Sequence, residues 1–292
     1  IIAIGGGTVV DIAKVLALQS NGNVDELYGK MPNLERACEL VIVPTTCGTG
    51  SEVTNLSILN RTRLGTKMGL VSNAMYADTA VLIPELLNNL PLGVFATSSI
   101  DALVHAVESS LSPKATAYTK LFGYKAIEMI LQAYRRIVAA GNTKESRAAE
   151  SETMLVASNF AGLAFGTAGC AAVHAMAYPL GAVYHVAHGE SNYALFTGVL
   201  KNYLEIKNSG EIQTMNEYLA KQLDCSVFVV YEELEKLLNH ILPKKPLRAY
   251  GVAAEDLTKL TDSVMKTQGR LMANAFVPLD TARVLKIYSE LY

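Results

Sequence analysis

Short apolar runs alternate with an amphipathic stretch in the first third of the chain. Ile1–Ile4, Leu40–Val43 and Thr79–Ile83 are apolar runs of strand length, and Val9–Gln19 has apolar residues at helical spacing. Strands of a parallel sheet are buried on both faces, and helices or loops connect them. This alternation therefore predicts a parallel α/β sheet.

Strand-like runs nearly vanish after residue 90, and long helical patterns take their place. The expected helices are Ser99–Leu111, Ala115–Ala140, Arg147–Phe165, Ala187–Tyr203, Ile212–Leu223, Ser226–Leu242, Ala254–Ala273 and Thr281–Tyr292. We therefore predict an α/β plus all-α fold, with a partial α/β domain over residues 1–90 and a helical domain over residues 91–292. Because Ile1 opens the chain inside what reads as a buried strand, we expect the amino-terminal part of the first domain to be missing.

The composition narrows the class of protein. Half of the 292 residues are hydrophobic, which is enough for a sizeable core. The net charge of −2 and the pI near 6.3 argue against a nucleic-acid partner or a polybasic membrane surface. The four cysteines show no Cys-x-x-Cys spacing, so neither a zinc ribbon nor a disulfide framework is indicated, and a reducing cytoplasm is the natural compartment.

The segment Thr153–Gly189 contains no Asp, Glu, Lys or Arg, which invites a membrane-spanning interpretation. Glycines, Asn159 and Pro179 interrupt it, so it holds no clean apolar run of membrane-spanning length, and we expect no membrane partner. The same segment holds His174 and His188. Their imidazoles need partners, because burying an unsatisfied polar group is costly.

Four residues have the character of a metal site. Asp101 and His105 stand four apart in a stretch with helical spacing, so their side chains share one face and can converge on one ion. His174 and His188 form a second pair, and a break at residues 179–181 is expected to turn the chain between them. One carboxylate and three imidazoles suit Fe²⁺ or Zn²⁺ better than Ca²⁺ or Mg²⁺, which prefer oxygen.

These residues also have a plainer interpretation. A single histidine on an apolar face is usually a hydrogen-bonded core residue, and Asp101 alone can favour a helix N-terminus. Three of the five histidines fall in this one arrangement, however, which favours the metal site.

Two loops follow predicted strands. The first, Gly5-Gly6-Gly7-Thr8, precedes a predicted helix, whose N-terminal N–H groups can bind an anion such as a pyrophosphate. A capping box of Thr8 and Asp11 is the alternative, and the two interpretations are compatible. The second loop, Thr45–Glu52, is rich in hydroxyl groups and lies where open α/β sheets bind ligands, which favours a ligand over a plain turn.

Four segments in this order, GGGTVVDIAK, VPTTCGTGSEVT, DALVHAVESSLSP and HAMAYPLGAVYHVAHGESN, resemble the iron-containing (group III) alcohol dehydrogenases over nearly the whole chain. The segments AHGESNYALF and KKPLRAYG, with Tyr178 where many members have His, look most like the 4-hydroxybutyrate dehydrogenase branch. The resemblance implies a dinucleotide-binding lobe, a helical metal lobe and a cleft between them. It also implies hydride transfer between NAD(H) and a short-chain alcohol or aldehyde, most simply 4-hydroxybutyrate and succinate semialdehyde.

The resemblance further implies roles for individual residues. It places the cofactor NAD against Gly6, Gly7, Thr8, Asp11, Thr45, Thr46, Thr49, Thr54 and Lys67. It assigns an Fe²⁺ ion, with Zn²⁺ as the alternative, to Asp101, His105, His174 and His188. It also implies a homodimer. The family's adenine-ribose contacts come from a portion upstream of Ile1, so these residues do not decide between NAD and NADP.

Two residues are candidates for the proton transfer. Tyr178 lies four residues after His174 and shares its helical face, but a tyrosine shuttles protons less well than histidine at neutral pH. His185 is the second candidate, and a simple loop role for it stays open. A substrate carboxylate would also need a cation, for which Lys245, Arg248 and Arg270 are candidates, each with solvated surface charge as the plainer interpretation.

The expected mechanism uses the ion as a Lewis acid on the aldehyde oxygen while the nicotinamide gives or takes hydride. A metal- and NAD-dependent lyase or cyclase of the dehydroquinate synthase type is one alternative. A non-catalytic nucleotide-binding fragment is another. The complete HAMAY…HVAHGE element favours the oxidoreductase.

Overall fold

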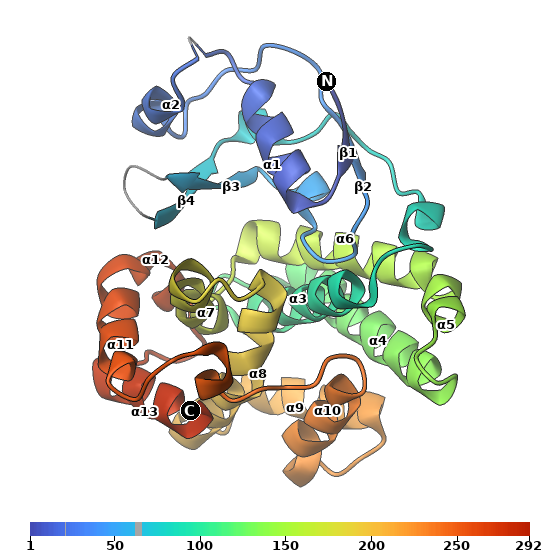
Figure 1. Cartoon of the computed structure of the whole chain (residues 1–292), viewed down its shortest axis with the longest axis vertical. Helices are drawn as coiled ribbons and strands as arrows, with labels where there is room; N and C mark the ends of the chain where they lie inside the picture. Colours follow the sequence, from blue (N-terminus) through green and yellow to red (C-terminus); the bar gives the residue numbers. More distant parts are fainter. Residues whose placement is uncertain (21, 62–65) are drawn as a thin grey trace.

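The computed structural model describes the backbone of residues 1–20, 22–61 and 66–292, and the side chains of these residues except at positions 60, 66 and 67. Its first lobe contains a parallel sheet in the order β1–β2–β5, formed by Ile2–Gly5, Val41–Pro44 and Thr79–Ala80. The predicted parallel α/β sheet is therefore confirmed (Figure 1). The third strand is shorter than the apolar run Thr79–Ile83, since only its first two residues pair with β2.

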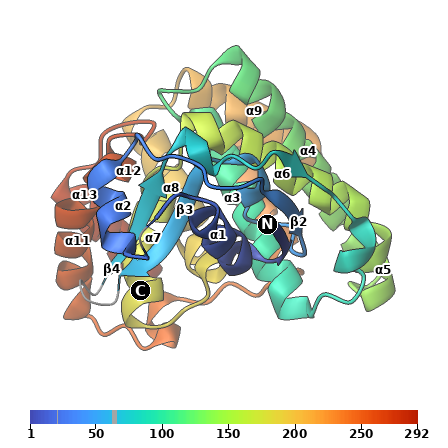
Figure 2. The same ribbon diagram turned by 90° about the horizontal axis from the view of Figure 1, so that it is seen from above.

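An antiparallel hairpin, which the apolar pattern did not indicate, completes this lobe. Its strands β3 (Leu56–Arg61) and β4 (Thr66–Val71) pair from Leu56 opposite Val71 to Arg61 opposite Thr66. Helix α1 (Gly7–Leu16) packs on both β1 and β3. The short helix α2 (Val24–Lys30) lies beside the hairpin (Figures 1 and 2).

The second lobe is helical, as predicted. Its α-helices are α3 (Leu92–Leu111), α4 (Ala117–Ala139), α5 (Lys144–Ala149), α6 (Ser151–Ala168), α7 (Ala172–Val183), α8 (His188–Ile206), α9 (Glu211–Leu223), α10 (Val230–Asn239), α11 (Asp256–Thr267), α12 (Gly269–Met272) and α13 (Thr281–Leu291). Its short 3-10 helices are η5 (Val227–Val229) and η6 (Leu247–Tyr250), whereas η1 (Ser51–Val53), η3 (Asn73–Met75) and η4 (Pro84–Leu87) precede α3 in the chain. Helix α3 is the centre of this lobe, because it packs against α4, α6 and α8 and is buried along most of its length.

Some helix boundaries differ from the predicted ones. The predicted helix Arg147–Phe165 is divided between α5 and α6, and Ala254–Ala273 between α11 and α12. The expected break at residues 179–181 is wrong, because α7 continues through Pro179 to Val183 and the chain turns only afterwards. Proline usually ends a helix because it lacks an N–H donor, but here the surrounding lobe packs α7 into its core. No single described helix is long and apolar enough to cross a membrane. The pair α6 and α7, bent by 105°, meets the length and hydropathy requirements of a membrane span only when the two helices are taken together.

The glycine loop differs from the capping-box alternative. Helix α1 begins at Gly7 with Gly6 as its N-cap, and no side chain in the described part of the chain caps it. Thr8 is therefore inside the helix. Asp11 instead accepts hydrogen bonds from Ser51 Oγ at 3.0 Å and from the backbone N–H of Ile58 at 3.1 Å. The side chain of Asp11 thus connects α1 to the second loop and to β3.

A buried lysine strengthens the same connection. Lys14 Nζ donates to Ser51 Oγ, Thr54 Oγ1 and the carbonyl of Leu56, at 2.9, 3.0 and 2.8 Å. Burial lowers the pKa of Lys14 to about 8, although nearby acidic groups act in the opposite direction. Its three acceptors lie at the end of the hydroxyl-rich loop and in the segment that follows it. Lys14 therefore holds that segment against the helix that starts at the glycine loop.

The two lobes meet at a pair of glycines. Gly50 has a φ of +53° at the start of η1, and it faces Gly162 in the middle of α6. A β-carbon on Gly162 would lie 2.6 Å from the carbonyl oxygen of Gly50, closer than side-chain carbons approach backbone atoms. The absence of a side chain at both positions lets the backbones of the two lobes touch.

We expect Gly162→Ala to lower the free energy of unfolding by about 1–3 kcal/mol, the usual cost of inserting a methyl group into a closed contact. Gly93→Ala is the matched control, since Gly93 also lies in a helix but has no atom near its added β-carbon. That change should be neutral or stabilising, because alanine favours helix. Denaturant unfolding of both variants checks the prediction, and equal stability of the two would contradict it.

Candidate active site

The four predicted metal residues come from three helices of the second lobe. Asp101 and His105 lie one turn apart on the buried helix α3. His174 is buried near the start of α7, and His188 is the first residue of α8, with a side chain that is 41% exposed. The reversal between α7 and α8 returns the chain to α3, as the spacing of the two histidines requires.

Three of these residues converge. Asp101 Oδ1 lies 3.6 Å from His174 Nε2 and 3.8 Å from His188 Nε2, and their three ligand atoms all lie within 4.8 Å of one another. His105 lies beside them, with its ring stacked on that of His174 at 4.6 Å between centroids. It groups with His174 and the thiol of Cys170, which the sequence analysis did not single out.

An asparagine occupies the centre of this cluster. Asn192 Nδ2 lies 2.6 Å from Asp101 Oδ1, 3.1 Å from His174 Nε2 and 3.4 Å from His188 Nε2. Its Oδ1 is buried and has no hydrogen-bond partner among the described residues. One carboxylate oxygen and two imidazole nitrogens gathered this closely are a donor set that fits a divalent ion of the Fe²⁺ or Zn²⁺ kind. Asn192 lies one helical turn after His188, and that spacing was the signal that could have found it.

The charges at the cluster suit a cation. Burial alone would raise the pKa of Asp101, but the charges of His188 and His174, the latter with a pKa raised well above its ordinary value, hold the pKa of Asp101 well below its ordinary value, so its carboxylate is ionised. Burial lowers the pKa of His105 to about 3, so its imidazole is neutral, and its Nδ1 lies 3.2 Å from the carbonyl oxygen of Gly48. An ionised carboxylate and a neutral imidazole are the forms that bind metals.

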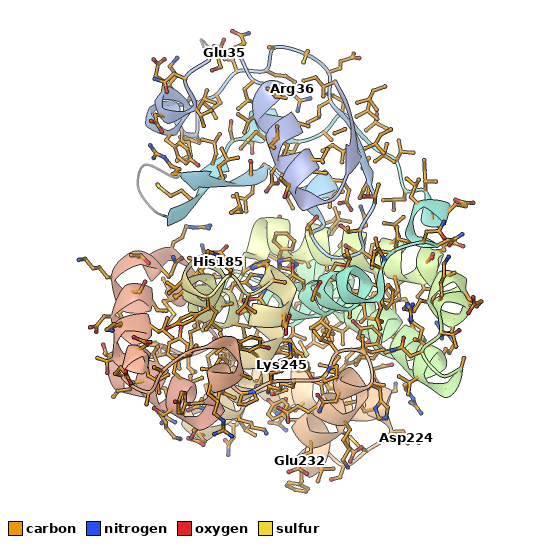
Figure 3. The ribbon with its side chains drawn as sticks, viewed as in Figure 1. Glu35, Arg36, His185, Asp224, Glu232 and Lys245 are labelled. Carbon is orange, nitrogen blue, oxygen red and sulfur yellow. The ribbon has the colours of Figure 1, made fainter. Side chains whose placement is uncertain are left out.

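The two proton-transfer candidates lie in different surroundings. Tyr178 is largely enclosed by α7 and its neighbours, with its ring 5.8 Å from that of His188, and burial raises its pKa to about 12. His185, labelled in Figure 3, is exposed beyond the end of α7, with a φ of +56°. It is not among the residues that line the cavity between the lobes, described next. The structure thus brings Tyr178, and not His185, to the metal candidates.

A cavity of about 240 Å³ joins the two lobes at this point. Its helical wall includes the metal candidates, Phe165, Cys170 and Tyr178, and its α/β wall includes Gly7, Thr8, Asp11, Thr49, Ser51, Thr54, Leu56 and Ile58. The glycine loop and the hydroxyl-rich loop touch there, because a β-carbon on Gly7 would lie 2.9 Å from Thr49 Cγ2. The cavity therefore connects a helix N-terminus with the carboxylate–imidazole cluster.

The other predicted cofactor residues have varied positions. Gly6, Thr45 and Thr46 lie in the two loops but do not line the cavity. Thr54 is among the lining residues, and its hydroxyl accepts a hydrogen bond from Lys14. Lys67 lies in β4, and its side chain is outside the described part of the chain.

Comparison with known proteins gives the family. Residues 1–84 match iron-containing alcohol dehydrogenase, and residues 95–292 match the C-terminal part of the Fe-containing alcohol dehydrogenase family. This chain belongs to the iron-containing alcohol dehydrogenases. Family membership supports the predicted oxidoreductase rather than a lyase or a non-catalytic fragment.

Individual relatives agree with this assignment. The chain is 46% identical to the 4-hydroxybutyrate dehydrogenase of Clostridium kluyveri, over 100% of this chain and 78% of the relative. It is 35% identical to long-chain-alcohol dehydrogenase 1 of Geobacillus thermodenitrificans, over 100% of this chain and 74% of that one.

Solved structures share the fold. Sulfoacetaldehyde reductase from Bifidobacterium kashiwanohense, in complex with NAD⁺, has a TM-score of 0.85 at 24% identity, over 99% of this chain and 75% of that one. A 1,3-propanediol oxidoreductase has a TM-score of 0.83 at 27% identity, over 100% of this chain and 76% of that one.

Proposed function

We propose that this alcohol dehydrogenase interconverts 4-hydroxybutyrate and succinate semialdehyde, with NAD as the hydride carrier and one Fe²⁺ or Zn²⁺ ion. The observation that carries the proposal is the cavity in which a glycine loop at a helix start faces a carboxylate–imidazole cluster. The substrate pair is supported by the 46% identity, over the whole chain, to an enzyme named for 4-hydroxybutyrate.

Each part of the cavity has a role in this proposal. When bound, the ion supplies Lewis-acid polarisation of the substrate C–O bond, and NAD supplies or accepts the hydride. Asp101, His174 and His188 would hold the ion, with His105 beside them as the fourth predicted ligand. Tyr178 keeps its proton at neutral pH, as any tyrosine does, and burial raises its pKa further, so its hydroxyl can orient a substrate oxygen by hydrogen bonding.

The cofactor is proposed to lie along the α/β wall. The backbone N–H groups at Gly7 and Thr8 open helix α1, where the helix dipole favours a pyrophosphate. Thr49, on the path from there to the metal candidates, offers a hydroxyl toward the nicotinamide side. The role of Lys67 stays a prediction. So do the homodimer and the cytoplasmic location, the latter supported by four free cysteines.

A substrate carboxylate needs a cation at the rim of the cavity. Lys245 is already paired with Glu190 at 2.9 Å, and Figure 3 shows it farther from the α/β lobe than His185. Arg270, on α12, comes near the hairpin: its Nη2 would lie 4.0 Å from a β-carbon on Gly69. Gly69 pairs with Ile58, which lines the cavity.

Arg270 also acts on the opposite wall, because its charge is among those that lower the pKa of Tyr178 against the larger effect of burial. Within the described part of the chain its guanidinium makes no ion pair, so it can take one from a ligand. Arg248 lies on the exposed η6, and no contact connects it with the cavity residues that the structure describes. We therefore propose Arg270 as the carboxylate anchor.

The metal assignment predicts that purified protein holds about one equivalent of a divalent ion and that His188→Ala loses it. His240→Ala is the control, because His240 is exposed and hydrogen-bonded to the carbonyl of Lys236 on α10. Elemental analysis of the three proteins gives the result. Full metal retention in the His188 variant, at unchanged affinity, would refute the assignment.

The cofactor assignment predicts that Gly7→Val abolishes NADH binding, because a branched side chain would stand where backbone must approach phosphate. Gly29→Val, on α2 of the same lobe, has open space around its β-carbon and should bind NADH as the parent does. Titration followed by NADH fluorescence measures both affinities. If Gly7→Val bound NADH normally, the glycines would serve only the contact with Thr49.

The substrate assignment predicts a preference for succinate semialdehyde over butyraldehyde of about 10- to 150-fold in kcat/KM. That factor corresponds to roughly 1.5–3 kcal/mol for one charge-assisted pair. Arg270→Met should remove the preference while the KM for NADH stays unchanged. Equal parent values for the two aldehydes would reject the substrate. A preference that survives Arg270→Met would reject only the anchor.

A further inference from the structure

A second carboxylate lies directly behind the metal candidates. Glu108 is on α3, two turns after Asp101 and one turn after His105, and only 2% of its surface is exposed. It does not line the cavity. A carboxylate this deeply buried must be satisfied by strong donors, since isolated burial of its charge is very costly.

The donors that the described residues supply to Glu108 come from the start of helix α7. Glu108 Oε1 accepts the backbone N–H of Val173 at 2.6 Å. Its Oε2 accepts the N–H of Ala171 at 3.2 Å and lies 2.6 Å from His174 Nδ1. Helix α7 begins at Ala172, and the N-cap Ala171 has no side chain that could satisfy these N–H groups. Glu108 therefore caps α7 from another helix, at the end where the helix dipole favours a negative charge.

The same contact determines which nitrogen of His174 is free. A carboxylate accepts hydrogen bonds. Nδ1 of His174 therefore carries the proton and donates a hydrogen bond to Glu108. In the neutral ring the lone pair is then on Nε2, the atom that lies 3.6 Å from Asp101 Oδ1 in the cluster. Carboxylates in this position orient metal-bound histidines and make them more basic.

We propose that Glu108 is a positioning residue of the metal centre, which fixes the tautomer and orientation of His174 and the start of the helix that carries it. The inference rests on the proposed metal site and extends it beyond the groups that contact the ion. One carboxylate thereby couples the folding of α7 to metal binding.

The test is the metal affinity of Glu108→Gln, measured with Zn²⁺ or Co²⁺ in competition with a chelator. The glutamine amide has one oxygen for three donors and turns its NH₂ toward at least one of them. We expect binding to weaken by 10- to 100-fold. The stabilisation of the protein by saturating metal should fall accordingly, by about 1.4–2.8 kcal/mol.

Glu150→Gln is the matched control. Glu150 is also a buried carboxylate with two short hydrogen bonds, at 2.6 and 2.7 Å, but they come from Arg136 on α4. This variant should be less stable than the parent and bind metal with unchanged affinity. A parent protein that binds no metal would refute the proposed metal site itself, whereas a parent that binds metal makes the Glu108 comparison decisive.

Glu108→Asp is the second variant, for use if Glu108→Gln does not fold. It keeps the charge but withdraws the carboxylate by one methylene, so we expect a smaller loss of metal affinity. In the Co²⁺-loaded protein, the paramagnetically shifted N–H signal of one imidazole should exchange faster with solvent in either variant. Parent-like affinity and exchange in the folded variants would reduce Glu108 to a helix cap and overturn the inference.

Discussion

Carboxylates buried on one face of α3 are the constraint on which the helical lobe depends. Asp101, His105 and Glu108 are spaced four and then three residues apart, so a 3.6-residue period places them on the same side of the helix. The described partners of Asp101 and Glu108 lie on α7 and α8, except for His105, which is on α3 and interacts with Asp101. Neither charge tolerates burial alone, so the three helices must meet where they do.

Much of this arrangement follows from local pattern. The spacing of Asp101 and His105 predicts one helical face, and the lack of charge around His174 predicts that its ring is buried and needs a partner. Apolar strand runs followed by loops predict a parallel sheet with ligands at its carboxyl edge. Each of these inferences needs only the spacing of apolar residues within one helix or strand and the cost of burying polar groups. Both can be judged from a short stretch of chain.

Several features that the apolar pattern and the motifs did not indicate depend on distant partners. In the sequence, Glu108 has the spacing of an ordinary acidic residue on a helix. Its role depends on three donors at the start of α7, more than 60 residues later. Lys14 is likewise buried only because Ser51 and Thr54, distant in the sequence, accept its hydrogen bonds. The continuation of α7 through Pro179 likewise depends on the packing around it, which outweighs the local preference of proline.

The contact between Gly50 and Gly162 has a consequence for how such an enzyme can change. Where two backbones touch, no side chain separates them, so a smaller side chain cannot bring the lobes closer. The spacing of the lobes at this point is therefore set by backbone contact. Substitutions at this contact therefore cannot narrow the distance between the lobes during evolution. Adaptation to a longer or shorter substrate must proceed through the residues that face the cavity, one side chain at a time, on an unchanging frame.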